Sequence, residues 1–203
     1  MAKKVSVIIP VWNQEDLICR AIESIPVRDD IEIIVIDDGS TDNTWRYIST
    51  LYDREDRIRL YKNDKNLGVG YTVNRGYDLA EGEYVVLLGS DDFFYSEEFE
   101  KIMSYLDGTD LVYFNLQIKN GDIWHINDNN KNGYVGSVKF MRRKFIGNTR
   151  CPKVRSGEDW FFFKELQSKN PTEKFTDITL KFYNFPRQNS LTDLRRRGLI
   201  DGE

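Results

Sequence analysis

Two pairs of aspartates in this chain each follow a run of apolar residues. Asp37 and Asp38 follow residues 31–36 (IEIIVI), and Asp91 and Asp92 follow residues 83–88 (EYVVLL) after a Gly-Ser step. Runs of about six residues rich in Val, Ile or Leu predict buried parallel strands. In an open α/β sheet, ligands bind beyond the carboxyl ends of the strands. Carboxylates at two such ends indicate a polar ligand held together with a hard cation.

The first pair has the chemistry to read a nucleotide base. Uracil, thymine and guanine carry an imide N–H that can donate a hydrogen bond to a carboxylate. Cytosine has an acceptor at the corresponding ring position. Asp38 therefore favours a uridine, thymidine or guanosine nucleotide. The same residues also fit a simple turn at Asp38-Gly39, with Ser40 or Asp42 capping the next helix, and the two interpretations are compatible.

The second pair indicates a metal ion. Adjacent carboxylates at the end of a buried strand repel each other, and a divalent cation removes that repulsion. Oxygen ligands suit Mg²⁺ or Mn²⁺, and Mg²⁺ takes one or two protein carboxylates together with substrate phosphates. Asp91 and Asp92 are thus the candidate metal ligands, and a solvated turn is the alternative.

The segments that must place these aspartates alternate between strands and helices. Strands are expected at residues 5–11, 31–36, 58–62 and 84–88, and helices at 15–25, 42–52, 69–80 and 97–106. Gly82 is expected to end the third helix as a left-handed cap, and Ser96 to cap the fourth. This alternation predicts an α/β fold with a mostly parallel, Rossmann-like sheet and helices on both faces.

The pattern changes after residue 107. A two-residue turn at Asn120-Gly121 is expected to join strands at 110–119 and 122–126. A helix at 160–167, ended by Asn170-Pro171, and a strand at 175–183 follow, while 134–145 has no clear assignment. We therefore divide one domain into a nucleotide-binding half, residues 1–107, and a smaller mixed acceptor half, residues 108–203.

The motifs together resemble family 2 glycosyltransferases of the GT-A fold. The resemblance covers roughly residues 4–100 and rests on five motifs in order: VSVIIPVWN ending at Asn13, DDGSTD from Asp37, NLG from Asn66, NRG from Asn74 and SDD ending at Asp92. Such enzymes transfer a sugar from a nucleotide diphosphate donor, usually a UDP-sugar, with inversion. The resemblance implies that Asp91 is the chief metal ligand. It also implies that the nucleotide is held by Pro10, Asn13, Asp37, Asp38, Asn66, Gly68 and Asn74.

Two positions depart from the family pattern. Gly89 stands where the family commonly has the first Asp of Asp-x-Asp-Asp, which leaves Asp91 and Asp92 for the metal. Val73 stands where a basic residue often precedes Asn74, although Arg75 is close by. Either change is expected to alter the preferred donor.

The second half supplies the candidate catalytic base. The family carries a Glu-Asp pair that Glu158 and Asp159 match, and its Asp takes the proton of the acceptor hydroxyl while the Glu supports it. Such general-base help contributes about 10²–10⁴ in rate. Ser156 and Asp159 are also spaced as a capping box at a helix start. Trp160 is expected either to face an acceptor sugar or, because it precedes three phenylalanines, to lie in the core.

Two further residues have weaker assignments. Arg187 lies in a segment that resembles the family's loop after the base, where a bidentate contact with the diphosphate is one role and a surface position the other. His125, the only histidine, is expected to be a structural or surface residue rather than a third metal ligand.

Charge is distributed unevenly. Residues 1–107 contain 12 Lys and Arg against 22 Asp and Glu, whereas residues 108–203 contain 17 against 11. The basic stretch at 139–144, followed by Arg150, Lys153 and Arg155, leads to the hypothesis of an anionic acceptor such as a phosphate-linked glycan, a lipid or a modified nucleic acid. Scattered surface charge is the alternative, and the oligomeric state is open.

The composition suggests a cytoplasmic protein. The two cysteines, Cys19 and Cys151, fit no metal spacing, the N-terminus does not resemble a signal peptide, and no apolar run reaches the ~20 residues of a bilayer span, so membrane contact would be peripheral. Two other functions remain: a GT-A-fold binding or regulatory protein with impaired catalysis, suggested by Gly89, and a nucleotidyltransferase. The latter usually has a Gly-rich loop after the first strand, which this chain lacks.

Overall fold

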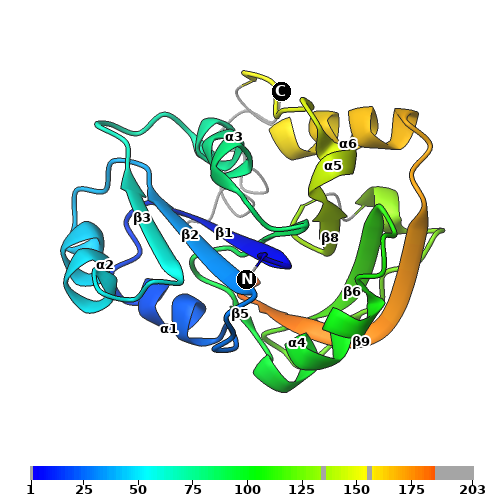
Figure 1. The fold of residues 1–203 in the computed structure, drawn as a ribbon, viewed down its shortest axis with the longest axis horizontal. Helices are drawn as coiled ribbons and strands as arrows, with labels where there is room; N and C mark the ends of the chain where they lie inside the picture. Colours follow the sequence, from blue (N-terminus) through cyan, green and yellow to red (C-terminus); the bar gives the residue numbers. More distant parts are fainter. Residues whose placement is uncertain (1, 134–135, 155–156, 186–203) are drawn as a thin grey trace.

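The computed structural model describes residues 2–133, 136–154 and 157–185. Its centre is one twisted sheet with the strand order β3-β2-β1-β4-β8-β6-β9-β5, and β7 pairs with β6 outside this path (Figure 1). The strands are β1 (Val5–Val11), β2 (Ile31–Asp37), β3 (Ile58–Lys62), β4 (Tyr84–Leu87), β5 (Phe93–Phe94), β6 (Leu111–Ile118), β7 (Ile123–Trp124), β8 (Lys139–Arg142) and β9 (Glu173–Tyr183).

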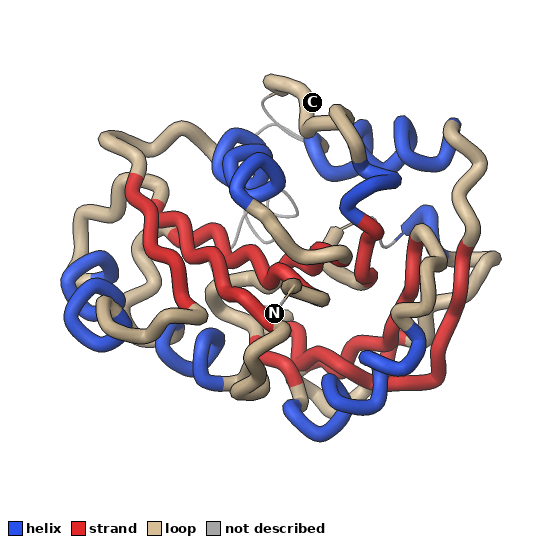
Figure 2. Tube along the Cα trace, viewed as in Figure 1, coloured by secondary structure: helices blue, strands red, loops and turns tan. Residues whose placement is uncertain are grey.

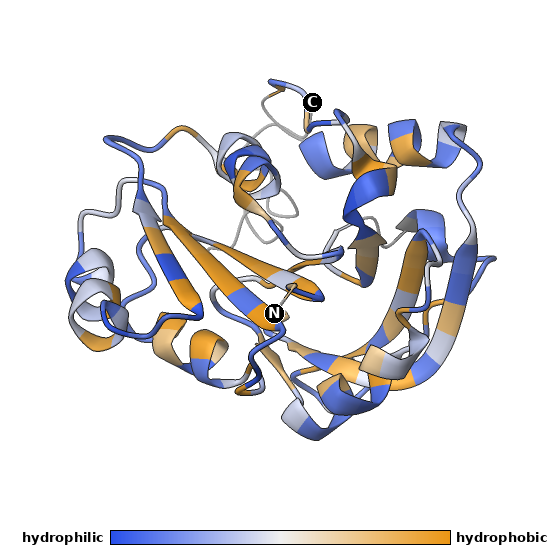
Figure 3. Ribbon diagram, viewed as in Figure 1, coloured by the Kyte–Doolittle hydropathy of each residue, from blue (hydrophilic) through white to orange (hydrophobic). Residues whose placement is uncertain are grey.

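The four strands expected in the first half form a parallel block. β1 lies between β2 and β4, with Ile8 opposite Ile34 on one side and Leu87 on the other, and β3 pairs with β2. Every residue of β2 is buried, which is why its Val and Ile run shows no alternation. In Figure 3 these central strands are mostly hydrophobic, whereas the helices contain both hydrophobic and hydrophilic residues.

Helices cover both faces of the sheet, as Figures 1 and 2 show. α3, α5 and α6 lie on one side, and α1, α2 and α4 lie on the other. A Cβ on Gly76 would come within 2.4 Å of Ile8 Cγ2, so this glycine lets α3 pack closely against β1. The helices are α1 (Ile18–Glu23), α2 (Thr44–Tyr52), α3 (Val69–Leu79), α4 (Ser96–Ile102), α5 (Arg143–Ile146) and α6 (Glu158–Ser168).

The second half adds antiparallel strands to the same sheet. β8 pairs antiparallel with both β4 and β6, and thereby joins the two halves. The long strand β9 runs parallel to β6 within the same sheet, and in Figure 1 it curves round the lower right of the molecule. The predicted α/β fold with helices on both faces is confirmed, and its antiparallel pairs lie in this mixed second half.

Several local expectations need correction. α1 covers only six of the eleven expected residues, and α4 ends in a short 3-10 turn (Met103–Tyr105). Ser96 is the first residue of α4, and no side chain caps that helix. Gly82 is not among the described glycines with positive φ; a Cβ there would lie 2.6 Å from the Ser6 backbone nitrogen, so its role is close approach.

The predicted hairpin exists, but its loop has three residues. The Ile118 N–H donates to the Asp122 carbonyl at 2.9 Å, which leaves residues 119–121 as the loop. Gly121 has φ +91°, the left-handed conformation that a three-residue loop with a bulge requires. None of the helices in the described part of the chain has the length and hydrophobicity needed to cross a bilayer.

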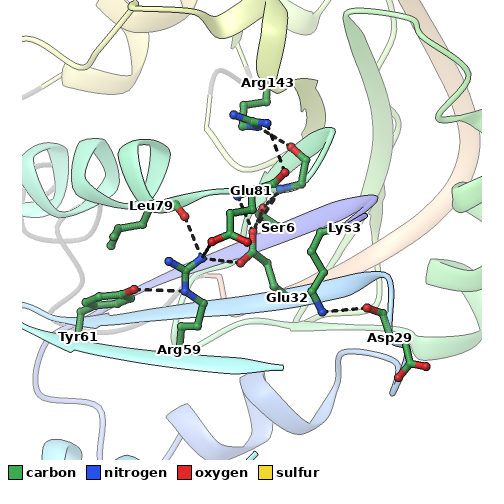
Figure 4. A network of polar contacts seen from close by, with 10 residues as sticks. Lys3, Ser6, Asp29, Glu32, Arg59, Tyr61, Leu79, Glu81 and Arg143 are labelled. Carbon is green, nitrogen blue, oxygen red and sulfur yellow. Dashed lines mark hydrogen bonds and ion pairs between the residues drawn. The ribbon is translucent and has the colours of Figure 1, made fainter. Parts of the chain in front are cut away.

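A buried carboxylate links the amino-terminal ends of β1, β2 and β3 (Figure 4). Glu32, 2% exposed, accepts hydrogen bonds from Ser6 Oγ at 2.5 Å, the Glu81 N–H at 2.6 Å and Arg59 Nη1 at 2.8 Å. Burial by itself raises the pKa of Glu32, but these hydrogen bonds outweigh it and hold the pKa below its usual value. The network joins β1, β2 and β3 to the segment after α3.

Replacing Glu32 with Gln should lower the free energy of unfolding at pH 7 by about 1–3 kcal/mol, because buried donors lose their charged acceptor. Since the folded-state pKa is depressed, the wild-type contribution is present above the unfolded pKa of about 4.3 and is lost as pH falls through the folded value. Urea unfolding between pH 7 and pH 3 measures both effects.

The matched control is Glu83→Gln, which removes a carboxylate that is 44% exposed and pairs with Lys4. Its effect should stay within about 0.5 kcal/mol. If Glu32→Gln and the wild type lost stability in parallel on acidification, the ionised Glu32 network would not be the cause.

Candidate active site

The loops after β1 and β2 bind each other at the carboxyl edge of the sheet. Asn13, in a left-handed conformation with φ +50°, donates its N–H to Ser40 Oγ at 3.0 Å, and its Oδ1 accepts from the Thr41 N–H at 2.8 Å. Asp37 accepts from the Ser40 N–H at 2.6 Å. Two of the predicted nucleotide-binding residues therefore build the rim of the site.

Asp38 anchors the loop that leads into α3. It is 4% exposed, and it accepts hydrogen bonds from Asn63 Nδ2 at 2.8 Å and from the N–H groups of Leu67 and Gly68, both at 2.9 Å. Of the two adjacent aspartates, Asp37 is the one with a buried oxygen, Oδ2, that has no hydrogen-bond partner in the described structure. The base-reading role of Asp38 stays a prediction, and the unused oxygen next to it belongs to Asp37.

Glycines and an asparagine shape the same loop. A Cβ on Gly39 would lie 2.5 Å from the Lys65 carbonyl carbon, so the two loops touch through their backbones. Asn66 is exposed and accepts from the Gly68 N–H at 3.1 Å, while Gly68 has φ +91° and precedes α3. Asn66 and Gly68 thus lie beside Asp38, as expected for one subsite.

Asp92 has a partner that the sequence did not suggest. Its Oδ2 lies 3.1 Å from Lys181 Nζ, and its Oδ1 accepts from the Asn184 N–H at 2.9 Å. Lys181 offsets the charge of Asp92, so the repulsion between the two aspartates does not by itself require a metal, and metal binding by this pair stays a prediction. Asp91 is half-buried, and its backbone carbonyl accepts from Arg20 Nη2 at 2.7 Å.

The residues fit a divalent cation held by one protein carboxylate in place of the two that the sequence predicts. No group of three or more His, Cys, Asp or Glu residues in the described ranges is arranged to hold a metal. Mg²⁺ can be bound by a single carboxylate with substrate phosphates. Asp91 can supply that carboxylate, whereas Asp92 is committed to Lys181. His125 is exposed, so of the two non-metal roles expected for it the structure shows a surface position.

A cavity of about 190 Å³ connects the two halves of the chain. Pro10 at the end of β1 and Gly89 after β4 line it from the predicted donor side, and Glu158 and Asp159 line it from the start of α6. Its remaining wall is mostly apolar and includes Val73, Tyr77, Leu87, Met141, Cys151 and Phe162.

The candidate base stands at this cavity. Asp159 is exposed, and a Cβ on Gly136 would lie 3.6 Å from its Oδ2, while its Oδ1 accepts from the Trp160 N–H at 2.9 Å. Gly157, left-handed with φ +76°, is the N-cap of α6 and has no side chain to cap it. Ser156, the other half of the proposed capping box, lies outside the described residues.

Lys139 and Tyr77 in the cavity wall were not foreseen. Lys139 is 2% exposed, donates to the Gly136 carbonyl at 3.2 Å and lies 4.6 Å from the Phe163 ring centroid. Burial lowers the pKa of Lys139 to about 7, against an opposing effect of Asp159 and Glu173. The Tyr77 hydroxyl is buried without a hydrogen-bond partner in the described structure. In the sequence, Tyr77 is one residue of an apolar helix face and Lys139 one lysine of a strand, so neither pattern indicates a position in the cavity wall.

Asn74 does not face the nucleotide loops. Asn74 Nδ2 donates a hydrogen bond to the Cys151 carbonyl, and Asn74 Oδ1 accepts one from the Cys151 N–H. Both hydrogen bonds are 2.8 Å long. Asn74 thereby fastens the segment before α6 to α3. Arg150 and Asp78 reinforce the same junction with an ion pair of 2.6 Å. The structure therefore gives Asn74 a clamping role in place of the predicted nucleotide contact.

The aromatic run at the start of α6 is divided between surface and core. Trp160 is 41% exposed and Phe161 47%, whereas Phe162 and Phe163 are buried. Lys164 Nζ lies 4.4 Å from the Trp160 ring centroid. The core placement expected for Trp160 is therefore wrong, and the exposed position agrees with the alternative. Arg187 lies outside the described residues.

Three cations of the basic stretch are engaged within the protein, whereas Lys144 and the nearby Lys153 are exposed. Lys139 is buried, Arg142 donates to the Gly108 carbonyl at 3.0 Å, and Arg143 donates to the Gly82 carbonyl at 2.7 Å. These cations stabilise the fold. The local charge that motivated the anionic acceptor is thus largely used within the protein, and Arg155 is not among the described residues.

Comparisons with known proteins bear on the family of this chain. The family model described as Glycosyl transferase family 2 matches residues 6–184. The chain is 32% identical over 182 residues to a GalNAc(5)-diNAcBac-PP-undecaprenol beta-1,3-glucosyltransferase of Campylobacter jejuni, covering 85% of this chain and 56% of that protein. It is also 29% identical to an uncharacterized glycosyltransferase of Haemophilus influenzae, with 78% and 70% covered.

Among solved structures, S. aureus TarS residues 1–349 in complex with UDP-GlcNAc has a similar fold. The TM-score is 0.80 at 22% identity, and the match covers 92% of this chain and 60% of that one. A similarity at this identity shows the fold alone. The chain spans about 30–70% of the length of the curated relatives described above and of two Rickettsia proteins.

Replacing Asn74 with Ala should disconnect the Cys151 segment from α3. Because two partly buried hydrogen bonds are lost, we expect the free energy of unfolding to fall by about 1–3 kcal/mol, while UDP binding stays near the wild-type value. Calorimetric titration of UDP and urea unfolding test this. Asn148→Ala, at an exposed position, is the control. Strong loss of UDP affinity with unchanged stability would restore Asn74 as a nucleotide ligand.

Proposed function

Because this chain belongs to glycosyltransferase family 2, we propose that it transfers a sugar from a nucleoside diphosphate donor, a UDP-sugar, to an acceptor hydroxyl with inversion. Membership rests on the family model that spans residues 6–184. It favours glycosyl transfer over the nucleotidyl transfer that the sheet architecture also allows. The donor, the stereochemistry and the acceptor are parts of the proposal.

The shared cavity is the observation that carries the proposal. It joins Pro10 and Gly89, at the carboxyl ends of β1 and β4, to Asp159 at the start of α6. Ligands of open α/β sheets bind beyond these strand ends, so a donor held there would face a carboxylate. A reaction that needs a leaving group on one side and a base on the other fits this geometry.

The chemical step follows from these positions. Asp159 takes the proton of the acceptor hydroxyl while that oxygen forms a bond with the anomeric carbon. The bond from the anomeric carbon to the diphosphate oxygen breaks, and its electron pair leaves with the nucleoside diphosphate. Attack from the side opposite the leaving group inverts the anomeric configuration. A bound Mg²⁺ or Mn²⁺ would offset the charge of the departing diphosphate.

Glu158 supports the base from the preceding position. A Cβ on Gly70 would lie 3.1 Å from Glu158 Cγ, so α3 and the first residue of α6 pack closely. The small residue at position 70 allows this contact. We assign Glu158 to the placement of Asp159, and Asp159 to the proton transfer.

The nucleotide would lie over the loops after β1, β2 and β3. Asp37 and Asp38 lie at this edge, and we assign the contact with the imide N–H to Asp38, because the unpartnered Asp37 Oδ2 is fully buried. Asn13, Asn66 and Gly68 surround the same edge. These contacts favour uridine over cytidine.

The acceptor is proposed to be a phosphate-linked glycan. Support comes from the Campylobacter relative, whose name describes a diphosphate-linked acceptor. The exposed Trp160 next to Asp159 offers an aromatic face on which a sugar ring can lie. The engaged arginines of the basic stretch add nothing to this assignment.

The cytoplasmic location expected from the sequence is part of the same proposal. Cys19 and Cys151 are free thiols, and burial raises the pKa of the Cys151 thiol to about 12, which keeps it unreactive. Fractionation of the native cell with an antibody against the chain tests the location.

A screen of nucleotide-sugars should give binding with UDP-sugars and weaker binding with CDP-sugars, because only the former present an imide N–H. Mn²⁺ should strengthen UDP-sugar binding. Calorimetry with and without Mn²⁺, together with slow donor hydrolysis, measures both. Equal affinity for uridine and cytidine nucleotides would remove the base-reading role of the aspartates.

Asp159→Asn should reduce transfer by about 10²–10⁴ while donor affinity stays near the wild-type value, because the amide cannot accept the proton. Single-turnover transfer and donor titration separate the two effects. Asp177→Asn, at an exposed position on β9, is the control. Equal loss of donor binding in Asp159→Asn would make this residue a structural cap, and wild-type binding without turnover would favour the impaired binding protein.

A further inference from the structure

The turn between β4 and β5 carries a buried ion pair that the proposed mechanism does not use. Asp92 Oδ2 lies 3.1 Å from Lys181 Nζ, and the two side chains are 3% and 2% exposed. Asp92 Oδ1 accepts from the Asn184 N–H at 2.9 Å. Both carboxylate oxygens are therefore held by β9 and the residues that follow it.

Lys181 is surrounded by groups that suit an ammonium ion. Besides Asp92, it donates a hydrogen bond to Ser137 Oγ, and it lies 5.4 Å from the centroid of the Tyr183 ring. A buried charge is stable only when it is paired and hydrogen-bonded. The carboxylate, the hydroxyl and the ring face meet that condition.

Gly89 belongs to the same arrangement. A Cβ at this position would lie 2.9 Å from Asp92 Oδ2 and 3.2 Å from Asp91 Oδ1. An acidic residue here would crowd both carboxylates where they now lie. A side chain at position 89 would force the two carboxylates to shift, whereas Gly89 leaves Asp92 in place against the Lys181 ammonium.

A divalent cation on Asp92 would meet the lysine. An ion coordinated by either oxygen would lie within a few ångströms of Nζ, and repulsion between cations is strong in a buried setting. Asp92 is therefore withheld from metal coordination as long as Lys181 holds it.

We propose that Lys181 is a positioning residue, the fixed counter-ion of Asp92, which leaves Asp91 as the one carboxylate of the 89–92 turn that meets a divalent cation. This inference rests on the proposed function, since the cation would bind together with the donor diphosphate. The turn is fastened from two sides, by Lys181 on Asp92 and by Arg20 on the Asp91 carbonyl.

The lysine also ties this turn to the base. Ser137, its hydrogen-bond partner, follows Gly136, whose Cβ position lies 3.6 Å from Asp159 Oδ2. The Gly136 carbonyl in turn accepts from Lys139. The cation-binding turn and the catalytic carboxylate therefore share one short segment, 136–139, as a common support.

Thermal unfolding with Mn²⁺ alone tests the counter-ion role. The wild type should show no measurable rise in Tm on addition of Mn²⁺. Lys181→Met should lower Tm by roughly 10 °C, because Asp92 is left buried and unpaired. Mn²⁺ alone should then raise the Tm of this variant, since Asp91 and Asp92 can share the ion. A purely structural lysine would give the lower Tm without the response to Mn²⁺.

The matched control is Lys174→Met, on the same strand, which breaks a more exposed ion pair with Asp107. It should respond to Mn²⁺ as the wild type does. Mn²⁺ that stabilises Lys181→Met no more than the control would overturn the proposal.

A second comparison decides the matter even if Lys181→Met does not fold. The gain in UDP affinity on addition of Mn²⁺ should persist in Asp92→Asn and should fall by at least about tenfold in Asp91→Asn. Equal loss in the two variants would make Asp92 a metal ligand and refute the counter-ion role.

The outcomes also distinguish this inference from the proposed function. If the wild type bound no nucleotide-sugar, the donor assignment would fail, and Mn²⁺ alone on Lys181→Met would still test the pair. If the donor bound with a Mn²⁺ gain that depended on Asp92, the function would stand and the role of Lys181 would fall.

Discussion

The site depends on how α3 is packed between the two halves of the chain. Gly76 brings the helix so close to β1 that no side chain fits between them. On its other side, Asn74 binds the Cys151 backbone, and Tyr77 stacks on Phe162 of α6 with 5.2 Å between ring centroids. One helix therefore fixes the distance between the strand ends and the carboxylate at the start of α6. A donor and a base can face each other only because this distance is fixed.

Burial gives the charged residues their separate roles. Asp38 and Asp92 are both almost fully enclosed, and each is stabilised by donors from distant loops. Asp91 is half-buried and Asp159 is exposed, so these two carboxylates remain near solvent and substrate. Enclosed carboxylates hold loops in place, whereas accessible ones are suited to a cation or a proton.

Short patterns were enough to predict the elements and the edge where the site forms. The strands that end near Asp37 and Asp91 were expected within one or two residues, because their Val, Ile and Leu runs are almost entirely buried in the sheet. The loop at Gly121 and the role of Gly82 were less well predicted, since both depend on pairing with other segments. Trp160 was left between surface and core because an aromatic run does not show which of its members face the core.

Local patterns were sufficient for the order of strands and helices, the carboxylates at the strand ends and the Glu-Asp pair that opens α6. The partners of these groups emerged only when the chain was folded. Asn74 meets a backbone 77 residues away, and Asp92 meets one 92 residues away, so neither contact leaves a local pattern. A strand lysine looks the same in sequence whether it points to solvent or to a buried carboxylate. The contact of Lys181 with Asp92 forms only when β9 has paired with β6 and β5 in the sheet.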